Sequence, residues 1–320
     1  MKADQVKTAA VIGTGVMGPG IAQVLAQGGV TVRLFGRSPE SSNKGLADVS
    51  RNLQSFARHG LVDPDDVAEV LHRVEPVSDL EQAVSGADFV VEAAPESRGL
   101  KRELFARLDE LCPARAVLAS NTSGLSITAM AQATGRPDKV VGAHFWNPAH
   151  LLPLVEVVRG EATSDETMTL TSELMARLGK SPVVVNKEVP GFVGTRLQQA
   201  MIREAFYIVE QGIATFEDVD TVVKTSFGRR LPITGPFETC DLGGLDVFLA
   251  VADSWADLCN NPDPSPILKE KVARGDLGGK TGRGLFDWSA QSLERITRLR
   301  EEELIHHLKR DLALTQDLQE

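Results

Sequence analysis

Residues 8–38 restrict the possible folds of this chain more than any other part of the sequence. The first apolar run, residues 9–12, predicts a short buried strand, and the run VTVRLF predicts a second strand after an intervening helix. Between the first strand and the helix, three glycines fit the pattern G-x-G-x-x-G, namely Gly13, Gly15 and Gly18. A strand, a glycine loop, a helix and a second strand in this order are typical of a dinucleotide-binding unit.

Glycines in such a loop let the backbone approach a pyrophosphate, whose charge the N-terminus of the following helix stabilises. NAD-binding units usually carry an acidic residue at the end of the second strand, where it binds the ribose hydroxyls. This chain has Gly36, Arg37 and Ser38 at that place. No carboxylate repels a 2′-phosphate there, and a guanidinium and a hydroxyl can bind one. We therefore predict NADP as the cofactor, with NAD as the alternative.

Length and composition indicate a globular protein of two domains. A chain of 320 residues exceeds one ordinary core, and 42% of its residues are hydrophobic. No apolar run approaches the roughly 18 residues of a membrane span, and the N-terminus lacks the pattern of a signal peptide. The cysteines have neither a disulfide nor a metal-binding spacing: Cys112, Cys240 and Cys259. We expect a cytoplasmic protein without a membrane partner or a metal.

The net charge of −10 argues against a nucleic-acid partner, because phosphate backbones are bound by clustered Lys and Arg side chains. A small phosphate-bearing cofactor requires only local positive charge. The partner that we expect is therefore a small-molecule substrate.

Strands and helices continue to alternate along the N-terminal half, which predicts a parallel, doubly wound sheet of the Rossmann type. The predicted strands ADFVVE, RAVLAS and KVVGAHF each lead into a polar loop, whereas residues 40–83 are expected to be mostly helical. Ligands of such sheets gather beyond the carboxyl ends of the strands. Glu96, Ser123 and His144 fall just after such ends, so we expect them to share one site.

The stretch HFWNPAHLLPLVEV contains both His144 and Glu156. An Asn-Pro pair favours a turn, so VVGAHF can end one strand and LPLVEVV can begin another that runs back towards it. A histidine held by a carboxylate has a fixed tautomer and a stabilised imidazolium, as a general base near neutral pH requires. The alternative is a core histidine with a satisfied hydrogen bond.

From residue 189 the predicted elements are all helical. We expect a dinucleotide-binding Rossmann domain over residues 1–188 and an all-α domain over residues 189–320. Helices such as TRLQQAMIREAFYIVEQG carry apolar residues at helical spacing and need a surface on which to bury them. The late loop GDLGGKTGRGLFDW allows close backbone approach, and its Lys280 offers a cation to the cofactor.

Together these features resemble the L-3-hydroxyacyl-CoA dehydrogenase family. The resemblance covers residues 8–288 and is carried by the glycine loop, VVEAAPE, SNTSGLSI, HFWNP with LVEVV, PGFV with RL, and GGKTGRGLFDW. It implies that His144 is the catalytic base, Glu156 its partner and Ser123 a donor to the substrate hydroxyl. Four residues match positions that contact the cofactor in the family: Glu96, Lys101, Asn147 and Lys280. The helical domain corresponds to a dimerisation domain, which implies a homodimer.

Three departures from the acyl-CoA pattern bear on the substrate. Thr195 stands where the family usually has an Asn that helps to arrange the base and the substrate carbonyl, and we count it as a catalytic candidate. Pro153 stands where many acyl-CoA enzymes have a Lys. The helix within residues 40–60 lacks the lysine-rich face that receives CoA phosphates in those enzymes. Pro153 and the extra C-terminal helix resemble relatives that act on small free hydroxy acids, such as carnitine and gulonate dehydrogenases.

We therefore predict an NAD(P)-dependent oxidoreductase of fatty acid metabolism that reversibly converts an L-3-hydroxyacyl-CoA into a 3-ketoacyl-CoA by hydride transfer. A dehydrogenase of a small free hydroxy acid is the alternative. A catalytically inactive cofactor-binding or structural protein is an interpretation of another class. The joint presence of His144, Glu156 and Ser123 argues against it.

Overall fold

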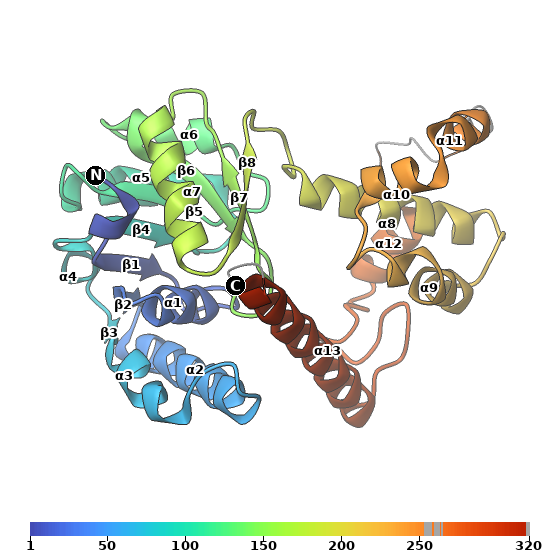
Figure 1. Cartoon of the computed structure of the whole chain (residues 1–320), viewed down its shortest axis with the longest axis horizontal. Helices are drawn as coiled ribbons and strands as arrows, with labels where there is room; N and C mark the ends of the chain where they lie inside the picture. Colours follow the sequence, from blue (N-terminus) through green and yellow to red (C-terminus); the bar gives the residue numbers. More distant parts are fainter. Residues whose placement is uncertain (253–257, 259–262, 264, 318–320) are drawn as a thin grey trace. The chain divides into compact units, whose positions relative to one another are not determined.

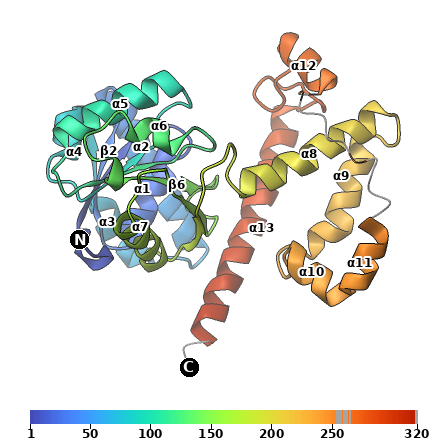
Figure 2. The same cartoon turned by 90° about the horizontal axis from the view of Figure 1, so that it is seen from above.

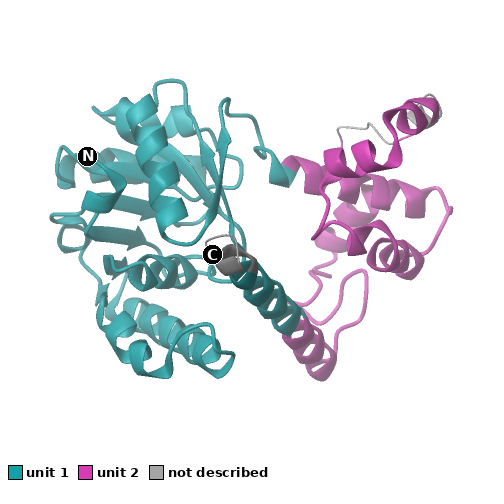
Figure 3. Ribbon diagram, in the orientation of Figure 1, with its two compact units in different colours: residues 1–195, 300–320 teal, residues 196–299 magenta. Residues whose placement is uncertain are grey.

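The computed structural model describes residues 1–252, 258, 263 and 265–317 (Figure 1). Cys259 and part of the segment LDVFLAVADSWADLC, whose apolar spacing also predicts a helix, lie outside these residues. The chain divides into two compact units (Figure 3), unit 1 with residues 1–195 and 300–320 and unit 2 with residues 196–299. Among the described residues, no helix combines the length and the apolar character that crossing a bilayer demands.

Unit 1 is built on one eight-stranded sheet with the strand order β3-β2-β1-β4-β5-β6-β7-β8. All neighbouring strands from β3 to β6 pair in parallel. The mostly parallel Rossmann-type sheet that the sequence predicts is thereby confirmed. The strands are β1 (Thr8–Ile12), β2 (Thr31–Phe35), β3 (Val74–Val77), β4 (Phe89–Glu92), β5 (Val117–Ser120), β6 (Val140–Phe145), β7 (Leu154–Val158) and β8 (Ser181–Val185).

The direction of the sheet reverses between β6 and β7, which pair antiparallel. β8 then runs parallel to β7. The expectation that the chain turns back after VVGAHF is thereby confirmed. Residues 146–153 form the turn between β6 and β7.

Helices cover both faces of this sheet (Figures 1 and 2). In β1, Ala9 and Val11 belong to one apolar core, whereas Ala10 and Ile12 belong to another. Successive side chains of a strand point to opposite faces, so a strand covered on both sides is apolar throughout. The first core is shared with α1 (Gly18–Gln27), α2 (Pro39–Arg58), α3 (Val67–His72) and α7 (Asp165–Arg177), and the second with α4 (Leu80–Val84), α5 (Arg98–Leu111) and α6 (Ile127–Ala131).

The edge strand β3 lies within residues 40–83, which are mostly helical as the sequence predicts, and it was not itself predicted. α2 and α3 are helical, but residues 74–77 pair with β2 at the edge of the sheet. Val74 and Val77 are buried while Glu75 is exposed. So short a run, with a charge and a proline in it, carries little strand signal in the sequence, and proline is tolerated in an edge strand.

From residue 189 onwards the described structure is helical, as the sequence predicts. Several large apolar side chains of unit 2 are exposed, including Phe237 at 87%, Leu242 at 79% and Leu249 at 71%. The helices are α8 (Gly194–Glu210), α9 (Phe216–Thr225), α10 (Pro236–Gly243), α11 (Leu245–Ala252), α12 (Pro266–Ala273) and α13 (Ala290–Asp317), and the short 3-10 turns of the chain are Ala3–Gln5, Pro64–Asp66, Pro137–Lys139 and Phe227–Arg229.

The C-terminal part of α13 is grouped with unit 1, because Ile305 packs there against Phe56 and Leu151. The division expected from the sequence assigned the whole of residues 189–320 to the helical domain. The compact units differ from that division in residues 189–195 and 300–320.

Candidate active site

The glycine loop joins β1 to α1. Gly13 has a φ of +126°, and a Cβ on it would lie 2.6 Å from the carbonyl oxygen of Ala93. A Cβ on Gly18 would lie 1.8 Å from the carbonyl oxygen of Gly13, so neither position accepts a side chain. A Cβ on Gly15 would have no atom within 4 Å, so the loop is open on that side. Within the part of the chain that the structure describes, no side chain caps α1, so its first free amides can meet a pyrophosphate.

The end of β2 leads directly into α2. A Cβ on Gly36 would lie 2.5 Å from the backbone nitrogen of Ser42, so the close approach of α2 requires glycine there. The hydroxyl of Ser38 caps α2 by accepting the Ser41 backbone N–H at 3.2 Å. Arg37 is exposed. Of the three predicted residues, Arg37 therefore presents the positive charge, while Gly36 and Ser38 shape the turn.

His144 and Glu156 lie opposite each other on β6 and β7. The Nδ1 atom of His144 is 2.8 Å from Oε2 of Glu156, and the two side chains are only 6% and 1% exposed. The predicted contact between them is confirmed. His144 lies within β6, one residue before its end, and not after the strand as expected.

The Glu156 carboxylate accepts four hydrogen bonds. Its Oε2 also accepts from the Trp146 indole at 3.2 Å, and its Oε1 accepts from the backbone N–H groups of Val193 at 2.9 Å and Gly194 at 3.0 Å. Burial raises the pKa of Glu156, but the four donors, with His144 first, outweigh burial and lower the pKa to about 2. Because an ionised carboxylate only accepts, Nδ1 of His144 carries the proton. Nε2 is then the nitrogen that can exchange a proton with a substrate.

Two aromatic rings flank the imidazole of His144. The ring centroids of Trp146 and Phe192 lie 5.6 and 5.7 Å from it. Phe192 is 1% exposed and has a φ of +47°, in the left-handed region that non-glycine residues avoid. Residues held in that region cluster at functional sites. Here the two amides that follow Phe192 donate to Glu156.

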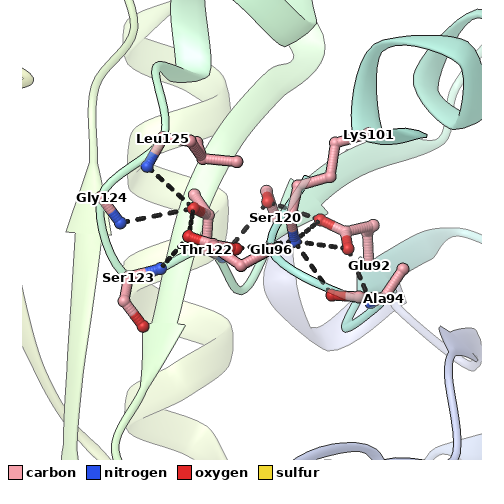
Figure 4. A network of polar contacts seen from close by, with 9 residues as sticks. All are labelled: Glu92, Ala94, Glu96, Lys101, Ser120, Thr122, Ser123, Gly124 and Leu125. Carbon is pink, nitrogen blue, oxygen red and sulfur yellow. Dashed lines mark hydrogen bonds and ion pairs between the residues drawn. The ribbon is translucent and has the colours of Figure 1, made fainter. Parts of the chain in front are cut away.

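A second buried charged pair lies at the ends of β4 and β5 (Figure 4). Lys101 of α5 is 1% exposed, and its Nζ donates to both carboxylate oxygens of Glu92, at 2.7 and 2.8 Å. It also donates to the carbonyl oxygen of Ala94 at 3.3 Å. Glu92, which is fully buried, accepts further bonds from the Ser120 hydroxyl at 2.6 Å and the Ala94 backbone N–H at 2.7 Å. The two buried charges are thus paired and hydrogen-bonded, as burial requires.

Glu96 connects this pair to the loop after β5 (Figure 4). Its Oε2 is 3.3 Å from Nζ of Lys101. Its Oε1 accepts from the backbone N–H of Ser123 at 3.1 Å and from the Thr122 hydroxyl. The same hydroxyl oxygen accepts from the Leu125 backbone N–H at 2.9 Å. Glu96 therefore orders the loop that carries Ser123, while its own side chain stays 46% exposed.

Ser123 and Asn147 are exposed, each in the loop that follows its strand. The two loops lie next to each other, since β5 and β6 are neighbours in the sheet. Asn121 connects them, because its side-chain oxygen accepts the backbone N–H of Phe145 at 2.8 Å. The structure thus places Glu96, Ser123, Asn147 and His144 on neighbouring strands and loops.

Three other residues were predicted to belong to the site. Lys101 is buried and bound by carboxylates, so its place in the structure is beneath Glu96. Thr195 is half-buried near the start of α8. Lys280 is exposed and belongs to unit 2.

Three residues that shape this site were not predicted from the sequence, namely Glu92, Trp146 and Phe192. All three fall inside the motifs VVEAAPE, HFWNP and PGFV. A carboxylate at the end of a buried strand, together with a lysine in the next helix, was the available signal for Glu92. No pattern in the sequence indicates that Phe192 has a positive φ.

A doubly wound sheet with a glycine loop before α1, and a buried histidine–glutamate pair on β6 and β7, is the architecture of a dinucleotide-dependent oxidoreductase. Comparison with known proteins agrees. Residues 8–189 match the family model of the 3-hydroxyacyl-CoA dehydrogenase NAD binding domain, and residues 191–288 match that of its C-terminal domain. The chain therefore belongs to the 3-hydroxyacyl-CoA dehydrogenase family, and it is an enzyme with an NAD-binding domain.

Individual relatives span nearly the whole chain. The probable 3-hydroxybutyryl-CoA dehydrogenase of Bacillus subtilis is 39% identical over 290 residues, which are 90% of this chain and 99% of that protein. The 5-formyl-3-hydroxy-2-methylpyridine 4-carboxylate 5-dehydrogenase of Mesorhizobium japonicum is 34% identical over 301 residues, 94% of this chain and 96% of that protein. A solved structure of an enzyme of the latter name, described as an NAD+ dependent dismutase, has a TM-score of 0.88 and 33% identity and covers 94% of this chain and 97% of its own.

Proposed function

We propose that this chain catalyses the reversible NAD-dependent oxidation of an L-3-hydroxyacyl-CoA to a 3-ketoacyl-CoA, with His144 as the general base. The observation that carries the proposal is the buried contact between His144 and Glu156. The Glu156 carboxylate accepts four hydrogen bonds, one of them from Nδ1 of His144. The imidazole is therefore held in one tautomer, and its Nε2 can accept a proton from the substrate.

In the forward reaction, Nε2 of His144 takes the proton of the substrate hydroxyl, and the electrons of that O–H bond form the carbonyl as hydride leaves the same carbon. A nicotinamide cofactor at this site would accept that hydride. Glu156 stabilises the imidazolium that results, and the Ser123 hydroxyl donates to the substrate oxygen. Thr195 takes the place of the usual amide near the substrate carbonyl. General base catalysis of this kind is typically worth about 10² to 10⁴ in rate.

The cofactor contacts are proposed to follow the same edge of the sheet. The backbone of the glycine loop binds the pyrophosphate. Gly13 and Gly18 have no room for a side chain and Gly15 faces open space, which fits that role. Lys101 acts by holding Glu96, which is itself half-exposed. The cofactor-binding residues that we propose are Gly13, Gly15, Gly18, Gly36, Arg37, Ser38, Glu96, Asn147 and Lys280, together with Lys101, which acts through Glu96.

Within this NAD-binding domain we propose a preference for NADP. Arg37 is exposed at the end of β2, and the residue before it is Gly36 where an acidic residue would repel a 2′-phosphate. Arg37→Ala should lower kcat/KM with NADP by about tenfold, equal to about 1.4 kcal/mol, and leave kcat/KM with NAD unchanged. Arg58→Ala, an exposed arginine at the other end of α2, is the control. A wild-type preference for NAD would contradict the proposal.

A small free acid is the second candidate substrate. One observation favours it. The match with the pyridine-carboxylate dehydrogenase covers 94% of this chain. The match with the probable 3-hydroxybutyryl-CoA dehydrogenase covers 90% of this chain, although it already includes 99% of that protein. The family models end at residue 288, so α13 also lies outside them.

The deciding experiment is NADH or NADPH formation with 3-hydroxybutyryl-CoA, 3-hydroxybutyrate and carnitine, each with NAD and with NADP. Turnover of the thioester alone supports the first candidate, and turnover of a free acid alone supports the second. A chain that binds cofactor and turns over none of the three contradicts both.

We further propose that residues 189–320 form a helical dimerisation domain, that the enzyme is a homodimer, and that it acts in the cytoplasm in fatty acid metabolism. The exposed apolar side chains Phe237, Leu242 and Leu249 support an interface in this region. Light scattering should give the mass of two chains, and the mass of one chain would contradict the homodimer.

A further inference from the structure

The C-terminal part of α13, from Arg300, is grouped with unit 1 (Figure 3). Ile305 is 3% exposed and forms an apolar cluster with Phe56 of α2 and with Leu151. Leu304 and Leu308 pack against the same cluster. Since Leu151 is only 2% exposed, the end of α13 contributes to enclosing it.

Leu151 lies in the turn of residues 146–153, which joins the strand of His144 to the strand of Glu156. Lys180 holds this turn at two other points, because its buried Nζ donates to the carbonyl oxygens of Ala149 at 2.6 Å and Leu152 at 3.0 Å. Two independent sets of contacts thus hold the turn. One is the apolar contact with α13, and the other is the pair of hydrogen bonds from Lys180.

The same turn also contacts the first helix of the cofactor-binding unit. The His150 ring lies 5.7 Å from the ring of Phe56. A Cβ on Gly20, near the start of α1, would lie 3.1 Å from Nδ1 of His150. The turn is therefore packed between α1, α2 and the end of α13, and its exposed residue Asn147 follows His144 closely in the chain.

We propose that Ile305 and Lys180 are positioning residues that hold the turn of residues 146–153 and thereby keep Asn147 in place for the nicotinamide cofactor. This rests on the proposed function, which gives Asn147 its cofactor contact. If the turn were loosened, only a fraction of molecules would present Asn147 correctly. The apparent dissociation constant would rise in inverse proportion to that fraction.

The test compares Ile305→Asp with two matched variants of the same helix. Ile305→Leu keeps the apolar contact, and Leu312→Asp places the same charge at a side chain that is 48% exposed. Lys180→Met tests the other hold on the turn and keeps the experiment informative if Ile305→Asp fails to fold.

Two measurements are made on each full-length variant. Hydrogen exchange, without cofactor, follows the amides of Leu151 and Leu152, which donate to the carbonyl oxygen of Pro148 at 3.1 and 3.0 Å. Fluorescence titration gives the dissociation constant of the reduced cofactor. We expect Ile305→Asp and Lys180→Met to exchange faster and to bind the reduced cofactor about tenfold more weakly, with kcat at saturating cofactor within about twofold of wild type. Ile305→Leu and Leu312→Asp should match wild type.

Unchanged exchange in both Ile305→Asp and Lys180→Met would overturn the inference, and so would faster exchange with unchanged cofactor affinity. Asn147→Ala separates this from the proposed function. If that variant binds the cofactor as wild type does, the cofactor contact of Asn147 is refuted, and the exchange rates alone then decide whether α13 and Lys180 hold the turn.

Discussion

Two buried pairs of polar side chains lie at the same edge of the sheet, and they differ in whether a hydrogen-bonding atom remains free. In the pair of Lys101 and Glu92, the ammonium group contacts two carboxylates and a carbonyl oxygen, and the Glu92 oxygens accept further donors. In the pair of His144 and Glu156, the carboxylate is equally saturated, but Nε2 of His144 makes no hydrogen bond within the described residues.

This difference indicates a division of labour. A pair whose donors and acceptors are all used can only hold structure, whereas a pair that ends in a free nitrogen can exchange a proton. The pair of Lys101 and Glu92 holds Glu96 and the loop of Ser123, and the pair of His144 and Glu156 is proposed to perform the chemistry. Substitutions in the first should mainly lower stability, and substitutions in the second should mainly lower rate.

The largest effect is expected from His144→Gln. The amide keeps a donor to Glu156 but provides no base, so kcat should fall by about 10² to 10⁴. Cofactor affinity and the thermal midpoint should stay close to wild type, as fluorescence titration and calorimetry would show. A kcat within about twofold of wild type would remove His144 from the role of base.

Lys101→Met should have the largest effect on stability. It leaves the buried Glu92 carboxylate without a counter-charge, which lowers the free energy of unfolding by about 3–5 kcal/mol in urea denaturation. Replacing both residues, as in Glu92→Leu with Lys101→Met, should restore much of that loss.

The control for this prediction is Arg107→Met on the same helix. Arg107 and Glu110 form an exposed pair, at 56% and 64% exposure, so the loss should stay at or below about 1 kcal/mol. If Lys101→Met were as mild as Arg107→Met, the first pair would not hold structure as described.

Glu156→Gln should have a smaller effect on stability, about 1–3 kcal/mol at neutral pH, because the amide oxygen of glutamine can still accept from the two backbone N–H groups, while its NH2 group faces the Trp146 indole and His144. The effect depends on pH. The pKa of Glu156 in the folded protein, about 2, is below its usual 4.5, so the unfolded chain binds more protons between these values. The stabilisation is complete above about pH 4.5 and is lost as the pH falls towards about 2. In urea denaturation at a series of pH values, the free energies of unfolding of wild type and variant should converge as the pH falls. A difference that stays constant with pH would contradict this.

Trp146→Phe is expected to have the smallest effect. It keeps a ring beside His144 and removes one of four donors to Glu156, so the free energy of unfolding should fall by about 0.5–1.5 kcal/mol. Activity should fall by less than about tenfold, because Nδ1 of His144 keeps its carboxylate. A loss of activity as large as that of His144→Gln would mean that the indole acts directly on the reaction.

Much of the sheet follows from local patterns in the sequence. Alternating strands and helices predict the parallel sheet, and the Asn-Pro turn between two apolar runs brings His144 opposite Glu156. The strand β3 was not predicted, because its residues, VEPV, include a charged residue and a proline. An edge strand is recognised from its pairing partner more than from its own composition.

The burial of Lys101 was also beyond local reasoning. The helix segment LKRELFARLDEL has the composition of a solvated helix, and only the approach of α5 to the end of β4 shows that this one lysine is buried. The positive φ of Phe192 likewise depends on tertiary contacts, because it serves two amides that donate to a residue distant in the chain. In both cases the local sequence favours one arrangement, and the tertiary contacts of the site impose another.

The most direct test of the central claim is the kcat of the double variant His144→Gln with Glu156→Gln, measured beside each single variant. If Glu156 acts on the reaction only through His144, the double variant should be no slower than His144→Gln alone. Losses that multiply, so that the double variant is slower by the full additional factor of Glu156→Gln, would show that the two residues act independently and would contradict the account.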